Sequence, residues 1–119
     1  MTPVRLLACL GSVLLAIGLW VLPAHAGKRL ALVIGNSQYQ NVTKLPNPAN
    51  DAADIAAKLT DLGFEVDPGI DLTQEQFDIL ISDFRGKIRA EQAEDVVFYY
   101  AGHAFNLDGL NQFVPVDAK

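Results

Sequence analysis

From residue 29 onward, short continuous apolar runs alternate with longer segments in which apolar residues recur at helical spacing. Residues 29–35 (RLALVIG) form a continuous apolar run that ends in glycine, which is typical of a strand buried on both faces of a parallel sheet. Residues 64–67, closed by Pro68-Gly69, are predicted as a second strand. Residues 96–100 (VVFYY) are predicted as a third, because β-branched and aromatic residues favour strands.

Two helices are predicted between these strands. The first begins at Asn47-Pro48, with Asn50 as a competing cap, and ends at Gly63. The second begins at Thr73, which forms a capping box with Gln76. The apolar face of the first helix consists of Ala52, Ile55, Ala56 and Leu59, and that of the second of Phe77, Leu80, Ile81, Phe84 and Ile88.

The order of strand, helix, strand, helix, strand predicts an α/β fold with a three-stranded parallel core and two right-handed crossovers. A further short strand is expected near residues 112–116, after a turn at residues 107–109. Ligands of such sheets bind beyond the carboxyl ends of the strands. Residues 35–37 and 101–104 are therefore the candidate site segments.

The first 26 residues have the pattern of a secretory signal peptide. Arg5 supplies the positive charge, residues 6–22 form an uncharged apolar run, and Ala24-His25-Ala26 is a small-x-small cleavage site. We expect a signal peptide over residues 1–26, cleavage after Ala26, and a secreted or periplasmic domain over residues 27–119. The alternative is an N-terminal membrane anchor. A lipoprotein site at Cys9 is disfavoured because the apolar run follows that cysteine.

Composition and charge limit the chemistry of this domain. Half of the 119 residues are apolar and 19% are charged, which excludes a disordered chain. The net charge of −5 argues against nucleic acid as a partner. Cleavage after Ala26 leaves no cysteine and a single histidine, His103, so we expect no metal and no cofactor.

His103 is the first candidate for chemistry, because it follows the third strand on a glycine-containing turn. An imidazole there can act as a general base near neutral pH. The ordinary alternative is a loop histidine bonded to a nearby carbonyl. Ser37 lacks a Gly-x-Ser-x-Gly elbow, no phosphate-binding glycine motif follows the first strand, and Tyr99-Tyr100 is interpreted as core packing.

Several motifs together resemble one family. They are residues 30–36 (LALVIGN), 45–48 (LPNP), 50–52 (NDA), 62–64 (LGF), 97–103 (VFYYAGH) and 113–118 (FVPVDA). In this order they resemble the start of a caspase-like domain of the bacterial caspase/metacaspase group of cysteine endopeptidases. The resemblance implies a caspase-like three-layer α/β/α sandwich with a mainly parallel sheet, truncated after the third core strand.

The resemblance also implies roles for three residues. His103 corresponds to the histidine of a Cys/His dyad, in which a thiolate forms a thioester and the imidazole protonates the leaving amine. The backbone N–H of Ala104 would bind the oxyanion; glycine is usual there, and alanine would be strained at a positive φ. Asp51 would help to line an acidic pocket for Arg or Lys at the cleavage point, although a solvated helix-start aspartate is an equally ordinary interpretation.

The nucleophile of caspase-type sequences lies roughly 50 residues after the histidine, near position 153 here. The chain printed above ends at Lys119, so we expect it to be inactive alone, with an unpaired apolar sheet edge. The expected partners are a protein or peptide substrate and the missing C-terminal part of its own domain; no nucleic acid and, after cleavage, no membrane is expected. The alternatives are a non-catalytic extracytoplasmic interaction module and an unrelated small α/β binding domain.

Overall fold

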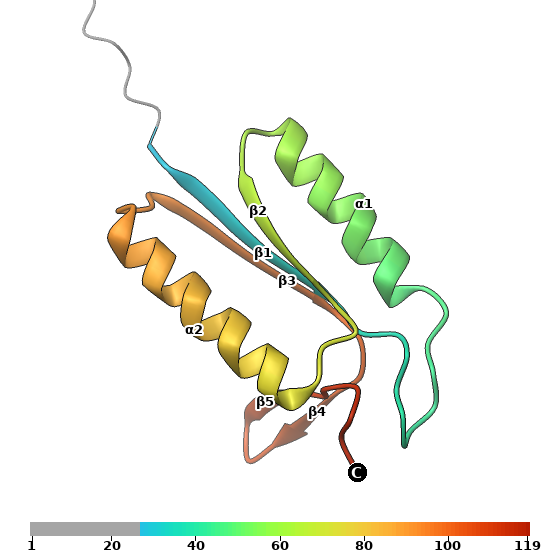
Figure 1. Cartoon of the computed structure of the whole chain (residues 1–119). Helices are drawn as coiled ribbons and strands as arrows, with labels where there is room; N and C mark the ends of the chain where they lie inside the picture. The colour runs from blue at the N-terminus through green and yellow to red at the C-terminus, as the bar shows by residue number, and fades with distance from the viewer. Residues whose placement is uncertain (1–26) are drawn as a thin grey trace, which may run out of the picture.

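The computed structural model describes residues 27–119, so the predicted signal peptide lies outside the described residues. In chain order the elements are β1 (Arg29–Gly35), α1 (Pro48–Asp61), β2 (Glu65–Ile70), α2 (Gln74–Ala90), β3 (Asp95–Ala101), β4 (Ala104–Leu107) and β5 (Leu110–Phe113). Three layers result, with α1 and α2 on opposite faces of a sheet (Figure 1). Within this part of the chain, neither helix is long and apolar enough to cross a membrane.

β1 is the central strand of the sheet. The strand order is β2-β1-β3, and both neighbours run parallel to β1. Leu32 lies opposite Asp67 on one side and Phe98 on the other. Residues 30–35 are buried, as expected of a strand with a neighbour on each side and a helix over each face.

Each helix covers one face of β1 with the residues that its periodicity indicated. Ala52 of α1 packs with Ala31 and Val33, joined by Ile55, Ala56 and Leu59. On the other face, Phe77 and Phe84 of α2 pack with Leu30, Leu32 and Ile34, joined by Leu80, Ile81 and Ile88. The capping box of Thr73 and Gln76 forms as predicted. The predicted α/β/α arrangement with a parallel sheet is therefore confirmed.

The predicted end of the second strand was wrong. β2 continues through Pro68-Gly69 to Ile70. Among the described strands β2 pairs with β1 alone, and an edge strand tolerates a proline because its open side needs no N–H donor. Gly69 allows α2 to approach closely, since a Cβ atom there would lie 2.7 Å from Cδ2 of Leu80.

The turn expected at residues 107–109 forms, but the strand after it spans Leu110–Phe113 and not residues 112–116. β4 and β5 form an antiparallel hairpin around Asp108 and Gly109, and both residues of the turn have positive φ. The hydrogen bonds of the hairpin end after Val114, because Pro115 has no N–H, and the backbone of Val116 bonds two loops instead. Its N–H donates to the Leu72 carbonyl at 2.9 Å, and its carbonyl accepts from Gln40 at 2.8 Å.

β3 has one open edge within residues 27–119. It pairs with β1 alone, while Val96 and Phe98 are exposed to 46% and 44%. Phe113 of β5 packs against Phe98, with ring centroids 5.4 Å apart. An apolar strip therefore borders this edge.

Candidate active site at the carboxyl end of the sheet

The carboxyl ends of the three strands meet at one edge of the sheet, called the rim here: residues 35–37, 70–72 and 101–104. The backbone N–H of Asn36 donates to the Ala101 carbonyl at 2.9 Å, and that of Asp71 donates to the Gly35 carbonyl at 3.0 Å. The two segments chosen from the sequence, residues 35–37 and 101–104, therefore lie side by side.

The His103 imidazole is half-buried at the rim, against the loop that follows β1. Its ring centroid lies 4.6 Å from that of Tyr39, and its Nε2 atom lies 2.7 Å from the Thr43 carbonyl oxygen. A carbonyl only accepts hydrogen bonds, so Nε2 carries the proton and, in the neutral ring, Nδ1 is the basic nitrogen. This is the contact of an ordinary loop histidine, and it fixes the tautomer that a general base needs. Within residues 27–119 no hydrogen bond reaches Nδ1.

Two tyrosine hydroxyl groups hold the backbone of His103. Its N–H donates to the Tyr39 hydroxyl at 2.6 Å, and its carbonyl accepts from the Tyr100 hydroxyl at 2.8 Å. The two hydroxyl oxygens are 3.2 Å apart. Burial, followed by the hydrogen bond with Tyr39, raises the pKa of Tyr100, so its hydroxyl keeps its proton. The interpretation of Tyr100 as core packing alone was therefore incomplete.

Ala104 is not strained, because it does not have a positive φ. The non-glycine residues with positive φ in the described part of the chain are Asp71, Gln92 and Asp108. Ala104 lies opposite Phe113 in the hairpin, and Val114 donates to the carbonyl of His103, one position outside that pair. Such an arrangement is a non-hydrogen-bonded pair, in which the N–H groups point away from the partner strand. The Ala104 N–H therefore points away from β5.

Asp51 lies in the first turn of α1 and is exposed. The start of α1 sits over the end of β1, since a Cβ atom on Gly35 would lie 2.7 Å from Cβ of Ala52. Asp51 is therefore on the rim side of the molecule. Its carboxylate makes no ion pair or hydrogen bond with any residue from 27 to 119, His103 included.

Ser37 caps α1 and is only 3% exposed. Its Oγ atom accepts from the Ala49 N–H at 3.0 Å. Asn47 occupies the N-cap position, as predicted, but its side chain makes no capping hydrogen bond. The cap therefore comes from the loop after β1, which fixes the start of α1 to the rim and leaves Ser37 unsuited to nucleophilic attack.

Two rim residues to which the sequence alone gave no role tie the loops together. Asn36 is fully buried; its Oδ1 accepts from the Leu72 N–H at 2.9 Å, and its Nδ2 donates to the Val114 carbonyl at 3.2 Å. Asp71 accepts from the N–H groups of Ser37 and Gln38 at 2.8 and 2.9 Å. Asn36 had been included in the candidate segment 35–37 and in a family motif, without a role of its own. The signal for a role was a polar residue directly after a fully apolar strand.

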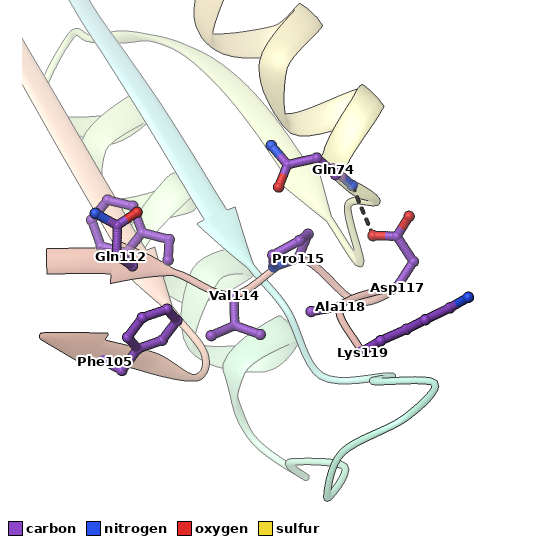
Figure 2. A pocket seen from close by; sticks show the side chains of 9 residues that line it. Gln74, Phe105, Gln112, Val114, Pro115, Asp117, Ala118 and Lys119 are labelled. Atoms are coloured by element: carbon purple, nitrogen blue, oxygen red, sulfur yellow. Dashed lines mark hydrogen bonds between the residues drawn. The ribbon is translucent and has the colours of Figure 1, made fainter. Parts of the chain in front are cut away.

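A shallow pocket of about 380 Å³ lies beside the hairpin and next to the rim. Phe105, Val114, Pro115 and Asp117 line it (Figure 2), and His103 does not. The Asp117 carboxylate is already engaged, because it accepts from the Gln74 N–H at 2.9 Å and so caps α2. The imidazole of His103 is therefore not part of this pocket.

Comparison with known proteins agrees with this geometry. The family model of the caspase domain matches residues 28–119. The human mucosa-associated lymphoid tissue lymphoma translocation protein 1 is 32% identical over 93 residues, which are 78% of this chain and 11% of that protein. Its mouse homologue gives the same identity and the same coverage. The chain thus spans about 11% of the length of these relatives.

Proposed function

Because the chain belongs to the caspase-domain family, we propose that residues 27–119 are the histidine-bearing part of a secreted cysteine endopeptidase. The observation that carries the proposal is the imidazole of His103, bound through Nε2 to the Thr43 carbonyl at 2.7 Å. That contact leaves Nδ1 as the base, and the following residue, Ala104, has a backbone N–H that points away from its hairpin partner. A base and an oxyanion donor on consecutive residues suit acyl transfer.

The reaction needs a thiol from outside residues 27–119, which contain no cysteine. Nδ1 of His103 takes the thiol proton, and the thiolate attacks the carbonyl carbon of the scissile peptide bond. The tetrahedral intermediate collapses, the C–N bond breaks, and the imidazolium gives its proton to the leaving amine. Water, deprotonated by the neutral imidazole, then hydrolyses the thioester and restores the thiol.

Ala104 would stabilise the negative oxygen of the tetrahedral intermediate. A single donor of this kind contributes about 3 kcal/mol to the transition state. The donor is a backbone N–H, so alanine supplies it as well as glycine does. The absence of a positive φ at Ala104 supports this role, because no strain has to be relieved when substrate binds.

Asp51 would favour a basic residue on the amino side of the cleaved bond. Its carboxylate is exposed, makes no ion pair within the described part of the chain, and lies on the rim side of α1. An Arg or Lys side chain of a substrate is the partner of matching charge.

Secretion is part of the proposal and rests on the sequence pattern of residues 1–26. Expression of the full chain with its native N-terminus, followed by N-terminal sequencing, tests it. We expect the mature protein to begin at Gly27 outside the cytoplasm. A chain that keeps residues 1–26 in the membrane fraction would instead support the anchor.

Activity is tested in two steps. The gene is first sequenced beyond the codon for Lys119, where an Asp-x-Cys-x-Gly-like segment about 35 residues further on is expected. The polypeptide that includes this segment is then assayed with fluorogenic peptides ending in Arg, Lys or Asp. His103→Ala is expected to lower kcat/KM at least about 100-fold. If no cysteine segment follows, the interaction-module alternative is favoured. If His103→Ala leaves cleavage unchanged, the assignment of His103 to the dyad is refuted.

The preference for a basic residue is tested in the same polypeptide with Asp51→Asn. We expect kcat/KM for the Arg peptide to fall about tenfold or more, because a charge-assisted contact is lost. Asp54→Asn is the matched control, since Asp54 is also exposed on α1, one turn further on. A stronger activity on the Asp peptide than on the Arg peptide would contradict the role of Asp51.

A further inference from the structure

The hydroxyl groups of Tyr39 and Tyr100 join the N–H of His103 to the carbonyl of the same residue. The distances along this path are 2.6 Å from His103 N to the Tyr39 hydroxyl, 3.2 Å between the two hydroxyl oxygens, and 2.8 Å from the Tyr100 hydroxyl to the His103 carbonyl. The three hydrogen bonds therefore close on a single residue.

Counting protons gives each of these bonds a direction. The carbonyls of His103 and Val114 only accept, so the one proton of the Tyr100 hydroxyl is directed to them, with the shorter distance, 2.8 Å, to His103. The Tyr100 oxygen is then free to accept, and Tyr39 donates to it. The Tyr39 oxygen in turn accepts from the His103 N–H. Each hydroxyl donates once and accepts once, which is the condition under which neighbouring hydrogen bonds strengthen one another.

The surroundings leave this arrangement little freedom. Tyr39 is 1% exposed although it lies in a loop, and its ring packs on the imidazole. Gly102 has φ of +154°, and a Cβ atom there would lie 2.6 Å from both hydroxyl oxygens. The Tyr100 hydroxyl also lies 3.2 Å from the Val114 carbonyl, which Asn36 binds as well.

We propose that Tyr39 and Tyr100 are positioning residues for the reaction. Their hydroxyl groups hold the backbone of His103 in place and thereby orient both its imidazole and the backbone N–H of Ala104. Fixing the N–H and the carbonyl of one residue fixes the two peptide planes on either side of it. The first orients the Cα–Cβ bond that carries the ring to Thr43, and the second includes the N–H of Ala104. This inference rests on the proposed function, because it assigns both groups to catalysis.

The closed set of hydrogen bonds between His103, Tyr39 and Tyr100 is tested first in the full 119-residue chain, by amide hydrogen exchange measured with NMR. Tyr39→Phe removes the acceptor of the His103 N–H, and we expect exchange of that amide to rise about tenfold relative to Leu32, which reports global opening. Tyr100→Phe is expected to give a smaller rise. The matched control is Tyr99→Phe, because Tyr99 packs on the α1 side of the sheet and makes none of these contacts.

The catalytic consequence is tested in the polypeptide that includes the cysteine. For Tyr39→Phe and Tyr100→Phe we expect kcat to fall about tenfold with KM unchanged, because misorientation of a reacting group slows the chemical step without weakening substrate binding. Tyr99→Phe is expected to change neither constant. A residue that serves only the stability of the fold would leave kcat of the folded fraction unchanged.

The outcomes separate this inference from the proposed function. If the longer polypeptide cleaves no peptide, the proposed function fails. The exchange data still report whether the hydrogen bonds between the two tyrosine hydroxyls and the backbone of His103 exist. If His103→Ala abolishes cleavage but neither Tyr→Phe variant lowers kcat, the positioning role is overturned and the proposed function stands. Exchange at His103 that is as fast in the wild type as in Tyr39→Phe also overturns it.

Discussion

The two ends of the same sheet are held by different kinds of interaction. At the rim, buried side chains such as Asn36 and Tyr39 bond the backbone of neighbouring loops. At the opposite end, called the base here (residues 28–29, 64–65 and 91–95), exposed ion pairs join the elements. Lys28 pairs with Glu65 and Glu91, and Arg29 pairs with Asp95 at 3.1 Å.

The difference makes the rim better suited than the base to carry the proposed site. A buried hydrogen bond to backbone is directional, and losing it leaves a polar group without a partner. An exposed ion pair is screened by solvent and tolerates many geometries, so it contributes little to stability. The rim thus fixes atoms to within a narrow range, which catalysis requires, whereas the base only has to keep the strands together.

The largest effect is expected for Gly102→Ala at the rim. The new Cβ atom would meet both tyrosine hydroxyls at 2.6 Å, on a backbone with φ of +154°. We expect the free energy of unfolding to fall by about 2–3 kcal/mol in chemical denaturation. Gly86→Ala is the control near the base: no atom lies within 4 Å of its Cβ position. There alanine should stabilise α2 by about 0.5–1 kcal/mol. Equal effects at both positions would contradict the contrast between the two ends.

Asn36→Ala is expected to have the next largest effect. It leaves the Leu72 N–H without a partner inside the rim and removes one of the two donors to the Val114 carbonyl. We expect a loss of about 2 kcal/mol in the free energy of unfolding. Asn50→Ala, at an exposed position of α1, should stay within about 0.5 kcal/mol of the wild type. If Asn36→Ala lowers the free energy of unfolding by less than about 0.5 kcal/mol, the stability of the rim does not depend on the buried amide of Asn36.

The helix cap gives a smaller and sharper test. Ser37→Ala removes the hydroxyl that accepts from the Ala49 N–H, and it should cost about 1 kcal/mol of unfolding free energy. Asn47→Ala changes the N-cap residue, whose side chain makes no capping hydrogen bond, and should cost less. Thermal denaturation of both variants decides the order. The reverse order would mean that α1 is capped locally, independently of the rim.

The smallest effect is expected at the base, as a dependence on pH. Hydrogen bonds from Lys28, and then from Lys87, lower the pKa of Glu65 from its ordinary 4.5 to about 2. A carboxyl with a lower pKa in the folded state stabilises the fold above its ordinary pKa, and this contribution is lost as the pH falls towards the folded value. The stability gap between wild type and Glu65→Gln should therefore close between about pH 4.5 and pH 2.

The same variant can be measured at increasing salt concentration. Added salt should also reduce the stability difference between wild type and Glu65→Gln, because exposed charges are screened. Glu75→Gln is the control, since Glu75 is exposed in α2 and makes no ion pair within residues 27–119. If neither acid nor salt changes the stability difference between wild type and Glu65→Gln, the ion pairs of Glu65 do not stabilise the base.

The elements with strong local patterns were predictable from the sequence. The continuous run at residues 29–35 identified the central strand, because a strand buried on both faces has no polar side to show. The capping box at Thr73 identified the first turn of α2. His103 could be placed at the rim because it directly follows a strand of a parallel sheet.

The rest depends on contacts between segments that are distant in sequence. Ser37 caps a helix twelve residues later, and Tyr39 is buried inside a loop that is polar overall. No local pattern indicates the capping role of Ser37. For Tyr39 the one signal is that it is a lone aromatic residue in a polar loop, which suggests that its side chain is packed. β4 was missed and β5 was placed two residues too late, because their exposed apolar residues do not alternate clearly with polar ones.

The most direct measurement identifies the tautomer of His103 by NMR in the ¹⁵N-labelled full chain, at a pH high enough for the imidazole to be neutral. The chain has two histidines, so a His25→Gln variant assigns the signals. We expect the proton on Nε2, held by the Thr43 carbonyl, and an unprotonated Nδ1. A proton on Nδ1, or two tautomers in comparable amounts, would contradict the assignment of His103 as a base poised at the rim.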